Sequence, residues 1–238
     1  MTSAGLSCEV IMLATKEIED YAKYSSELWS KYCDHKGYHF RRYTERIIPD
    51  MHVNWSKIEM VRQHLNNSKA DVVTLVDADT YVCNLDMSLT DMLERASPKS
   101  MVFSPDTCGI GIVERPLNCY AALSNFTRRL PNAGFIIMKN SDFARQFFAD
   151  WMELARNKLN HLADKHPRNQ RVLWKGLYFQ NRDKIALLDG EVRRVATEFQ
   201  IGKAIKQGCD VIHVRGGLPQ KGVTRLLQRD RLEISCFQ

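Results

Sequence analysis

The most informative stretch of this chain is VVTLVDADT, residues 72–80. Its first five residues are β-branched or apolar and carry no charge, which is typical of a strand buried on both faces of a sheet. Two aspartates, Asp77 and Asp79, follow at the point where the strand becomes a loop. Ligands of open α/β sheets bind beyond the carboxyl ends of the strands. The stretch therefore predicts a buried strand and also the place where the chemistry lies.

Strand-like and helix-like stretches alternate on both sides of this segment. Further strands are expected at residues 8–14, 38–44, 100–104, 133–138, 184–188 and 210–214. The spacing of apolar residues predicts helices at 18–35, 55–65, 88–95 and 141–159, with Gly37 ending the first of them. This alternation predicts one α/β domain with a mainly parallel central sheet and helices on both faces.

The composition excludes several classes of protein. Of the 238 residues, 44% are hydrophobic and 26% are charged, as in an ordinary globular domain. No apolar run approaches the ~20 residues of a membrane-spanning helix, so no transmembrane segment is expected. The formal net charge of +6 favours anionic partners. Because the basic residues are dispersed among acidic ones, a nucleic-acid partner is not expected, whereas a phosphorylated small molecule fits.

The cysteines indicate a reducing compartment. There are seven, an odd number, and no two stand in the spacing of a zinc knuckle or a thioredoxin motif. With no membrane anchor visible in this chain, we expect a cytoplasmic protein. Three glycosylation sequons, beginning at Asn54, Asn66 and Asn125, favour the alternative, which is the Golgi-luminal domain of a longer protein.

Asp77 and Asp79 are the first candidate metal ligands. Side chains at positions i and i+2 of a strand share a face, so the two carboxylates lie close together and repel each other. A hard divalent cation removes that repulsion. The alternative is a surface turn with two solvated aspartates.

An Asp-x-Asp pair after an apolar strand also opens the signature of haloacid dehalogenase-type phosphatases. That signature has Thr or Val four positions after the first aspartate, where this chain has Tyr81. It also needs a downstream acidic cluster, for which Asp189-Gly190-Glu191 is a poor match. A metal-dependent phosphatase is therefore the alternative function, and it predicts no role for a distant histidine or lysine.

His213 is the third candidate ligand. It lies in a short predicted strand and precedes Gly216-Gly217 and Lys221. Imidazole suits Mn²⁺ and related metals, glycines let the backbone approach a phosphate, and lysine supplies a compact positive charge. Taken alone, the segment favours the alternative of a half-buried histidine before a surface turn. Because this strand and residues 72–76 are expected to end at the same sheet edge, we predict a metal site of Asp77, Asp79 and His213.

Five segments, ordered along nearly the whole chain, resemble nucleotide-sugar glycosyltransferases of the GT-A fold. The resemblance is to the galactomannan galactosyltransferase and xyloglucan xylosyltransferase family and to the glycogenin and galactinol synthase family. The segments are Lys31-Tyr32-Cys33 with Gly37-Tyr38, Trp55-Ser56-Lys57-Ile58, Asp77-Ala78-Asp79-Thr80, Asn132-Ala133-Gly134-Phe135 with Lys139-Asn140-Ser141, and His213-x-x-Gly216 with Lys221. Each is weak alone, and the five together are specific.

The resemblance implies a single GT-A (Rossmann-like) domain over residues 1–238, with a nucleotide-binding part at about 1–100 and an acceptor-side part at about 101–238. It implies a metal-dependent enzyme that moves a sugar from a UDP-sugar to a hydroxyl of a glycan or other acceptor, with retention of anomeric configuration. It also implies Mn²⁺, or Mg²⁺, on Asp77, Asp79 and His213, bridging the diphosphate of the donor.

The resemblance also implies further donor-site residues. These are Ala14, Thr15 and Tyr21 near the uridine, Lys57 and Ala78 beside the donor, Asn132 and Gly134 facing the donor sugar, and Gly216 with Lys221 at the leaving phosphate. Tyr21 stacks on the base or packs in the core, since its helical spacing allows either. An exposed helical lysine is the alternative for Lys57.

One departure from these families concerns the loop that reaches the anomeric carbon. The families often carry Asp-Gln there, and the corresponding residues of this chain are Asn169 and Gln170. Gln170 keeps a carbonyl that can stabilise an oxocarbenium-like centre, whereas Asn169 cannot act as a base or nucleophile. Asp106 is the second candidate catalytic residue, with a turn-forming aspartate after proline as the alternative. The asparagine also raises the alternative of a non-catalytic protein that binds nucleotide sugars.

Overall fold

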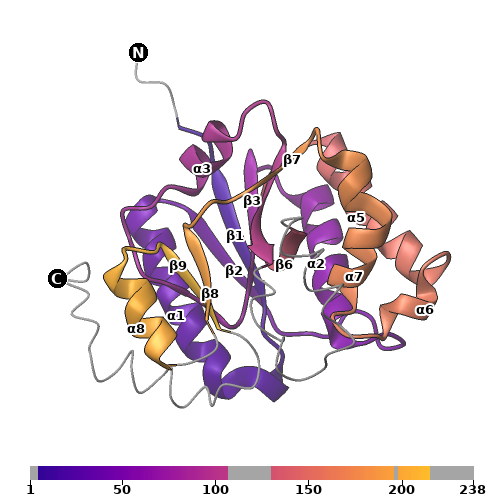
Figure 1. Cartoon of the computed structure of the whole chain (residues 1–238), viewed down its shortest axis with the longest axis horizontal. Helices are drawn as coiled ribbons and strands as arrows, with labels where there is room; N and C mark the ends of the chain where they lie inside the picture. Colours follow the sequence, from indigo (N-terminus) through magenta and orange to yellow (C-terminus); the bar gives the residue numbers. More distant parts are fainter. Residues whose placement is uncertain (1–4, 107–129, 196–197, 215–238) are drawn as a thin grey trace, which may run out of the picture.

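The computed structural model describes residues 5–106, 130–195 and 198–214 (Figure 1). Its main sheet has six strands in the order β2-β1-β3-β6-β5-β7. Their bounds are β1 Cys8–Leu13, β2 His39–Tyr43, β3 Val72–Asp77, β5 Met101–Asp106, β6 Leu130–Lys139 and β7 Ile185–Leu187. Strand β6 runs antiparallel to β3 and β5, and the other neighbouring pairs are parallel. The predicted mainly parallel sheet is therefore confirmed.

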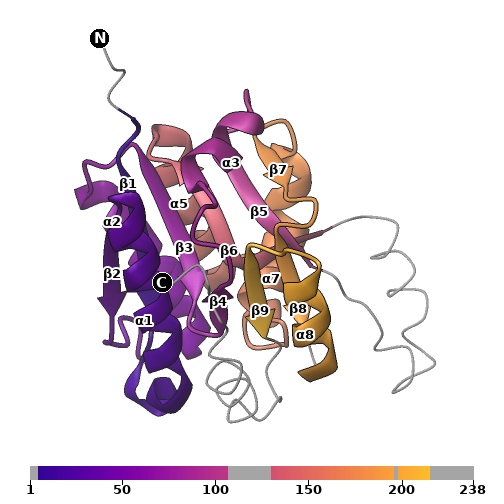
Figure 2. The ribbon, with the colours of Figure 1, turned by 90° about the vertical axis from the view of Figure 1, so that its left-hand side faces the viewer.

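Helices cover both faces of this sheet, as the sequence predicts. The helices are α1 Glu19–Lys36, α2 Val53–Asn67, α3 Leu89–Arg95, α5 Asp142–Arg156, α6 Asn160–Ala163, α7 Asn169–Val172 and α8 Glu198–Lys206, and the π-helical segment Leu173–Tyr178 follows α7. Figure 2 shows α1 and α3 in front of the sheet and α5 behind it. Strand β3 serves both layers, because Val73 and Leu75 lie in the core with α2 and α5, whereas Val72 and Val76 lie in the core with α1 and α3.

The register of the main sheet places the carboxyl ends of β1 and β3 beside the middle of β6. Leu13, the last residue of β1, pairs with Asp77, the last residue of β3. On the other side of β3, Val76 pairs with Phe135 of β6. Residues 14, 77 and 134 therefore gather at one edge of the sheet, next to one another.

A second, smaller sheet was not expected from the sequence. It consists of β4 Thr80–Val82, β9 Val211–Val214 and β8 Val192–Val195, in that order. Strand β9 pairs antiparallel with β4 and parallel with β8, and α8 packs against this sheet through a small core of its own. The expectation that residues 210–214 belong to the central sheet is therefore wrong. Strands of three or four residues are too short to show a period, so their pairing partners are decided by tertiary contacts.

Local signals in the sequence explain several boundaries. Helix α1 ends at Gly37, whose φ of 67° is the left-handed conformation that glycine adopts at little cost. Ser88 and Ser141 cap α3 and α5 by accepting hydrogen bonds from backbone N–H groups of the first turn. In the described residues, no helix has the length and apolar character required to cross a membrane.

Candidate active site

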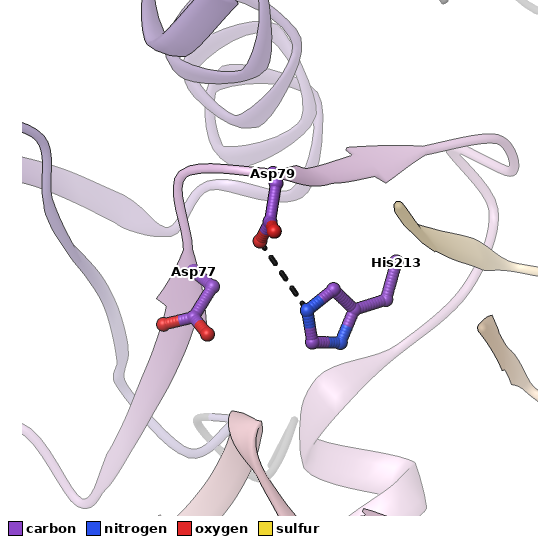
Figure 3. Close-up of side chains that lie close together, drawn as sticks. All are labelled: Asp77, Asp79 and His213. Carbon is purple, nitrogen blue, oxygen red and sulfur yellow. Dashed lines mark ion pairs between the residues drawn. The ribbon is translucent and has the colours of Figure 1, made fainter. Parts of the chain in front are cut away.

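Three segments supply the predicted metal ligands. Asp77 ends β3, Asp79 lies in the turn before β4, and His213 lies on β9. Their candidate ligand atoms lie within 4.8 Å of one another, and the His213 Nε2 atom is 3.3 Å from Asp79 Oδ1. Figure 3 shows the His213 ring turned toward both carboxylates. The predicted set of ligands is therefore brought together.

The way in which His213 comes close to the two aspartates differs from the one expected. His213 does not follow a strand of the central sheet; it reaches the aspartates through the second sheet. Strand β4 begins directly after Asp79, and Thr80 pairs with His213 in the antiparallel ladder of β4 and β9. The Val214 N–H also donates to the Asp79 carbonyl oxygen at 2.9 Å. Because the turn and β9 are joined by backbone hydrogen bonds, the imidazole has a fixed position relative to the carboxylates.

Gly134 forms the floor of this cluster. A Cβ atom at this position would lie 2.3 Å from the Cε1 atom of His213 and 2.6 Å from Oδ2 of Asp77. Any side chain would therefore occupy the space between the ligands. The His213 ring is buried, and among the described residues its Nδ1 atom has no hydrogen-bond partner. Two carboxylates and an imidazole around an open space fit a divalent ion such as Mn²⁺.

Lys57 of α2 compensates part of the negative charge. Its ammonium lies 2.5 Å from Asp77 Oδ1, and the residue is only 9% exposed. The alternative of an exposed helical lysine is therefore wrong, because α2 packs along β3 and directs this side chain to the strand end. Burial alone raises the pKa of Asp79, but His213, and then Lys57, lower it by more, so that pKa lies below its ordinary value. Asp79 is ionised at neutral pH.

A cavity of about 230 Å³ opens beside the cluster. Its lining includes half of the predicted donor-site residues: Thr15, Tyr21, Lys57, Asp77, Ala78 and Asp79. Val53 and Asn54, at the start of α2, also line it and were missed, since nothing in the local sequence marks them. Tyr21 packs against the core, as one alternative predicts, and it also lines the cavity; its stacking on a base stays a prediction. Ala14 is buried at the end of β1, where its N–H donates to the Tyr43 carbonyl oxygen at 2.8 Å.

A second cavity of about 460 Å³ adjoins the first. Both cavities are lined by Thr15, Ile18 and Val53. The second cavity extends further, past Arg46, which follows β2, and past His52, which directly precedes α2. Ligand pockets in proteins commonly measure roughly 300–1,000 Å³. The two adjoining cavities together therefore form an elongated binding cavity. It runs from the carboxylates of Asp77 and Asp79 along the carboxyl ends of β1 and β2.

The two predicted catalytic residues, Gln170 and Asp106, contact each other. Gln170, in α7, donates from Nε2 to Oδ2 of Asp106, the last residue of β5. The Gln170 Oε1 atom accepts from Asn132 Nδ2 at 3.0 Å and from the Ala133 N–H at 3.1 Å. Asn132 in turn accepts from the Gly134 N–H at 2.8 Å through its Oδ1 atom. A chain of hydrogen bonds therefore runs from Asp106 to the floor of the metal cluster.

This network of hydrogen bonds corrects one expectation. Asp106 is not a turn residue after a proline; it is a buried strand residue that also forms an ion pair with Arg194 of β8. The side-chain carbonyl oxygen of Gln170 has two lone pairs, and both accept hydrogen bonds from β6. The amide is therefore held in the wall of the site, and its action on the anomeric carbon stays a prediction. Arg194 was missed, because a basic residue in a short strand carries no local signal.

Asn169 has a structural role. Its side-chain Oδ1 atom accepts from the backbone N–H of Gln170 at 2.8 Å. Its backbone carbonyl oxygen accepts from the Trp151 indole N–H at 2.9 Å. The residue is 3% exposed. The remaining candidates, Gly216 and Lys221, lie outside the described residues.

Comparison with known proteins gives the class of the chain. Residues 8–105 match the model of the galactosyl transferase GMA12/MNN10 family. No curated protein matches the sequence significantly.

Three solved structures show how widely the fold is shared. A glycosyltransferase involved in the glycosylation of the major capsid of PBCV-1 has a TM-score of 0.69 at 13% identity, over 94% of this chain and 99% of that chain. The galactosyltransferase LgtC, in complex with donor and acceptor sugar analogues, has a TM-score of 0.55 at 10% identity, over 93% of this chain and 95% of its own. The glycosyltransferase GlyE of Streptococcus pneumoniae TIGR4 has a TM-score of 0.52 at 12% identity, over 88% of this chain and 54% of its own.

At these identities the solved structures show the fold, and the family match gives the kind of enzyme. The resemblance predicted from the five sequence segments is confirmed. The chain is a glycosyltransferase with the GT-A fold, similar over residues 8–105 to the galactosyl transferase GMA12/MNN10 family.

Proposed function

We propose that this glycosyltransferase moves a sugar from a UDP-sugar to a hydroxyl group of a glycan or other acceptor, using Mn²⁺ or Mg²⁺. The observation that carries the proposal is the cluster of Asp77, Asp79 and His213 over Gly134, at the end of the elongated cavity. A hard cation on these ligands fits a diphosphate, and the cavity beyond it has room for a nucleoside. The phosphatase alternative loses support, because it gives His213 no role.

In this proposal the uridine lies near Ala14, Thr15 and Tyr21, and the diphosphate lies beside Lys57 and the metal. Asn132 and Gly134 face the donor sugar. Gly216 and Lys221 are proposed to contact the leaving phosphate, on the strength of the sequence resemblance alone. The solved LgtC structure that contains donor and acceptor sugar analogues supports a two-substrate arrangement of this kind.

The reaction breaks the bond between the anomeric carbon and the diphosphate oxygen, and the electron pair leaves with the diphosphate. The acceptor oxygen forms the new bond to that carbon and releases its proton. When bound, the metal supplies Lewis-acid stabilisation of the leaving group. The chain's own residues hold the reacting parts: Lys57 adds positive charge beside the carboxylates, and Gly134, which has no side chain, leaves space between Asp77 and His213.

We further propose retention of anomeric configuration. An inverting enzyme needs a carboxylate positioned as a base for the acceptor hydroxyl. Asn169 cannot serve as one, and the Asp106 carboxylate already accepts from Gln170 and Arg194. Gln170 and Asp106 stay our candidates for the sugar-facing polar wall. A neighbour's structure supports this choice, since one LgtC structure is that of an active-site mutant in which a glutamine is replaced by glutamate.

For the compartment we propose the cytoplasm. The described cysteines Cys8, Cys33, Cys83 and Cys209 are free thiols. The cytoplasm keeps thiols reduced. Fluorescence microscopy of the full chain in its own cells tests this proposal, and a signal confined to the secretory pathway would contradict it.

Calorimetric titration of UDP, with and without Mn²⁺, tests the function. We expect binding that requires the metal, that is lost in Asp79→Asn, and that is kept in the control Asp86→Asn, whose carboxylate is exposed. Release of sugar from UDP-sugars in the same protein then separates an enzyme from a non-catalytic binding protein. If UDP fails to bind with or without metal, the donor-site assignment is wrong.

A further inference from the structure

Arg194 connects the two sheets beside the active site. It lies on β8, directly paired with His213 on the neighbouring strand β9. Its side chain is only 18% exposed and forms an ion pair with Asp106, which ends β5 in the main sheet. The small second sheet therefore contributes both a candidate metal ligand and a partly buried cation to the site.

The cation acts on the Gln170 amide through Asp106. A carboxylate only accepts hydrogen bonds, so the amide must direct its Nε2 group to Asp106. The Ala133 N–H only donates, so the amide must direct its Oε1 atom to β6. The two partners together allow one orientation of the side chain, and that orientation also holds Asn132.

Arg194 is an ion-pair partner of the Asp106 carboxylate. The carboxylate is only 3% exposed, and a buried charge without a partner is costly. The residue before the glutamine, Asn169, carries no charge; it donates from Nδ2 to the Asn54 carbonyl oxygen and accepts from the Gln170 N–H through Oδ1. The carboxylate on Gln170 is instead supplied from β5, and its counter-charge from β8.

We propose that Arg194 is a positioning residue for glycosyl transfer. It holds Asp106, Asp106 sets the orientation of the Gln170 amide, and Gln170 sets Asn132 on the sugar-facing floor. The effect on turnover rests on the proposed function, whereas the effect on the Gln170 amide does not. A purely structural ion pair would stabilise the fold without changing either the amide orientation or the ratio of turnover to binding.

Kinetics with matched variants test the effect on turnover. Arg194→Gln is expected to lower kcat for donor hydrolysis or transfer by about 10- to 100-fold, the usual cost of losing an outer partner of a site residue. The dissociation constant for UDP with Mn²⁺ is expected to stay unchanged. Arg194→Lys keeps the charge but loses the planar fork, so partial recovery of kcat is expected. The control is Arg193→Gln, an exposed position on the same strand, which is expected to leave kcat unchanged.

A double-mutant cycle with Asp106→Asn tests whether the two residues act as one unit. We expect the double variant to lose no more activity than Asp106→Asn alone, because removing Asp106 already breaks the connection. Additive losses in kcat would overturn the proposal, and so would wild-type kcat in Arg194→Gln.

Nuclear magnetic resonance on the glutamine-labelled full chain gives a readout that needs no substrate. The side-chain amide signals of Gln170 are expected to shift in Arg194→Gln and in Asp106→Asn, and to stay in place in Arg193→Gln. Unshifted signals in a folded Arg194→Gln protein would overturn the positioning role, whether or not the protein binds UDP. If the wild-type protein does not bind UDP, the proposed function is wrong. The amide shifts would still report the effect of Arg194 on Gln170.

Discussion

At the scale of single residues, the position of Gly134 leaves no space for a side chain. Its position lies between the predicted ligands, so even one methyl group would overlap His213 and Asp77. Gly202, in α8, has nothing within 4 Å of its Cβ position and makes a matched control. The comparison separates a need for space in the site from a general effect of replacing glycine.

We predict that Gly134→Ala lowers the metal-dependent affinity for UDP by more than tenfold, because His213 and Asp77 are pushed apart. The variant should also lose about 1–3 kcal/mol of unfolding free energy through overpacking. Gly202→Ala should keep the affinity and gain slightly in stability, since alanine is the better helix former. Calorimetry measures the affinity for UDP, and urea denaturation measures the free energy of unfolding. Wild-type affinity in Gly134→Ala would contradict the proposed metal position.

Lys57 gives a second prediction at this scale, since its ammonium competes with a metal ion for the negative charge of Asp77. Lys57→Met should raise the Mn²⁺ affinity of the ligand-free protein by roughly tenfold, because a nearby like charge is removed. It should lower the affinity for UDP in the presence of metal, since a cation beside the diphosphate is lost. Electron paramagnetic resonance counts free Mn²⁺, and the exposed Lys69→Met serves as control. Unchanged Mn²⁺ affinity in Lys57→Met would show that its charge does not reach the metal position.

At the scale of elements, the turn between β3 and β4 is held from several sides. The Thr80 hydroxyl donates to the Asp77 carbonyl oxygen at 2.6 Å, and the Trp29 indole of α1 lies 3.1 Å from the same hydroxyl oxygen. Ser25, also on α1, donates to the Thr80 carbonyl oxygen at 2.5 Å. Helix α1 therefore fixes the first residue of β4, and β4 fixes the strand that carries His213.

We predict that Thr80→Val costs about 1–3 kcal/mol of unfolding free energy, because a buried carbonyl group loses its donor. It should also weaken Mn²⁺ binding, since the spacing of Asp77 and Asp79 depends on this turn. Thr74→Val is the control. Thr74 is a buried threonine of β3, and its hydroxyl oxygen lies 4.0 Å from the Cys8 Sγ atom. That variant should keep both stability and metal affinity. Equal effects of the two substitutions on Mn²⁺ binding would contradict the role of the turn.

At the scale of the whole molecule, one histidine away from the site links stability to pH. His64 of α2 is buried, and its ring lies between the Tyr43 hydroxyl, 2.8 Å from Nδ1, and the Glu9 carboxylate, 2.6 Å from Nε2. A neutral ring satisfies both partners, because Tyr43 donates and Glu9 accepts. Burial lowers the pKa of His64, and the nearby Glu9 carboxylate opposes the shift without reversing it.

We predict that the free energy of unfolding falls as the pH drops below about 6.5, the ordinary histidine pKa in an unfolded chain. Below that pH the unfolded chain takes up a proton that folded His64 resists, so protonation favours unfolding. Urea denaturation between pH 8 and pH 5 measures the slope. Tyr43→Phe removes the hydroxyl that donates to Nδ1 and should flatten the slope near pH 6. Stability that rises on acidification through this range would contradict the prediction.

Much of the architecture follows from short stretches of sequence. The buried strand at 72–76, the glycine that ends α1 and the serine caps of α3 and α5 each act within a few residues, so periodicity and capping chemistry reveal them. Position within the chain also identified Asp77 and Asp79, because side chains just after a buried strand lie at the carboxyl edge of the sheet.

Residue type and local spacing were enough to predict the α/β alternation, the candidate metal-ligand types and the glycosyltransferase resemblance. The tertiary fold was needed to show that His213 arrives through a second sheet and that Lys57 lies on Asp77. It alone showed that Gln170 takes its carboxylate from Asp106, with Arg194 as the counter-charge. The physical reason is that strands of three or four residues carry too little pattern to select a partner. Their pairing is selected by the burial and the hydrogen bonds that many distant segments satisfy together.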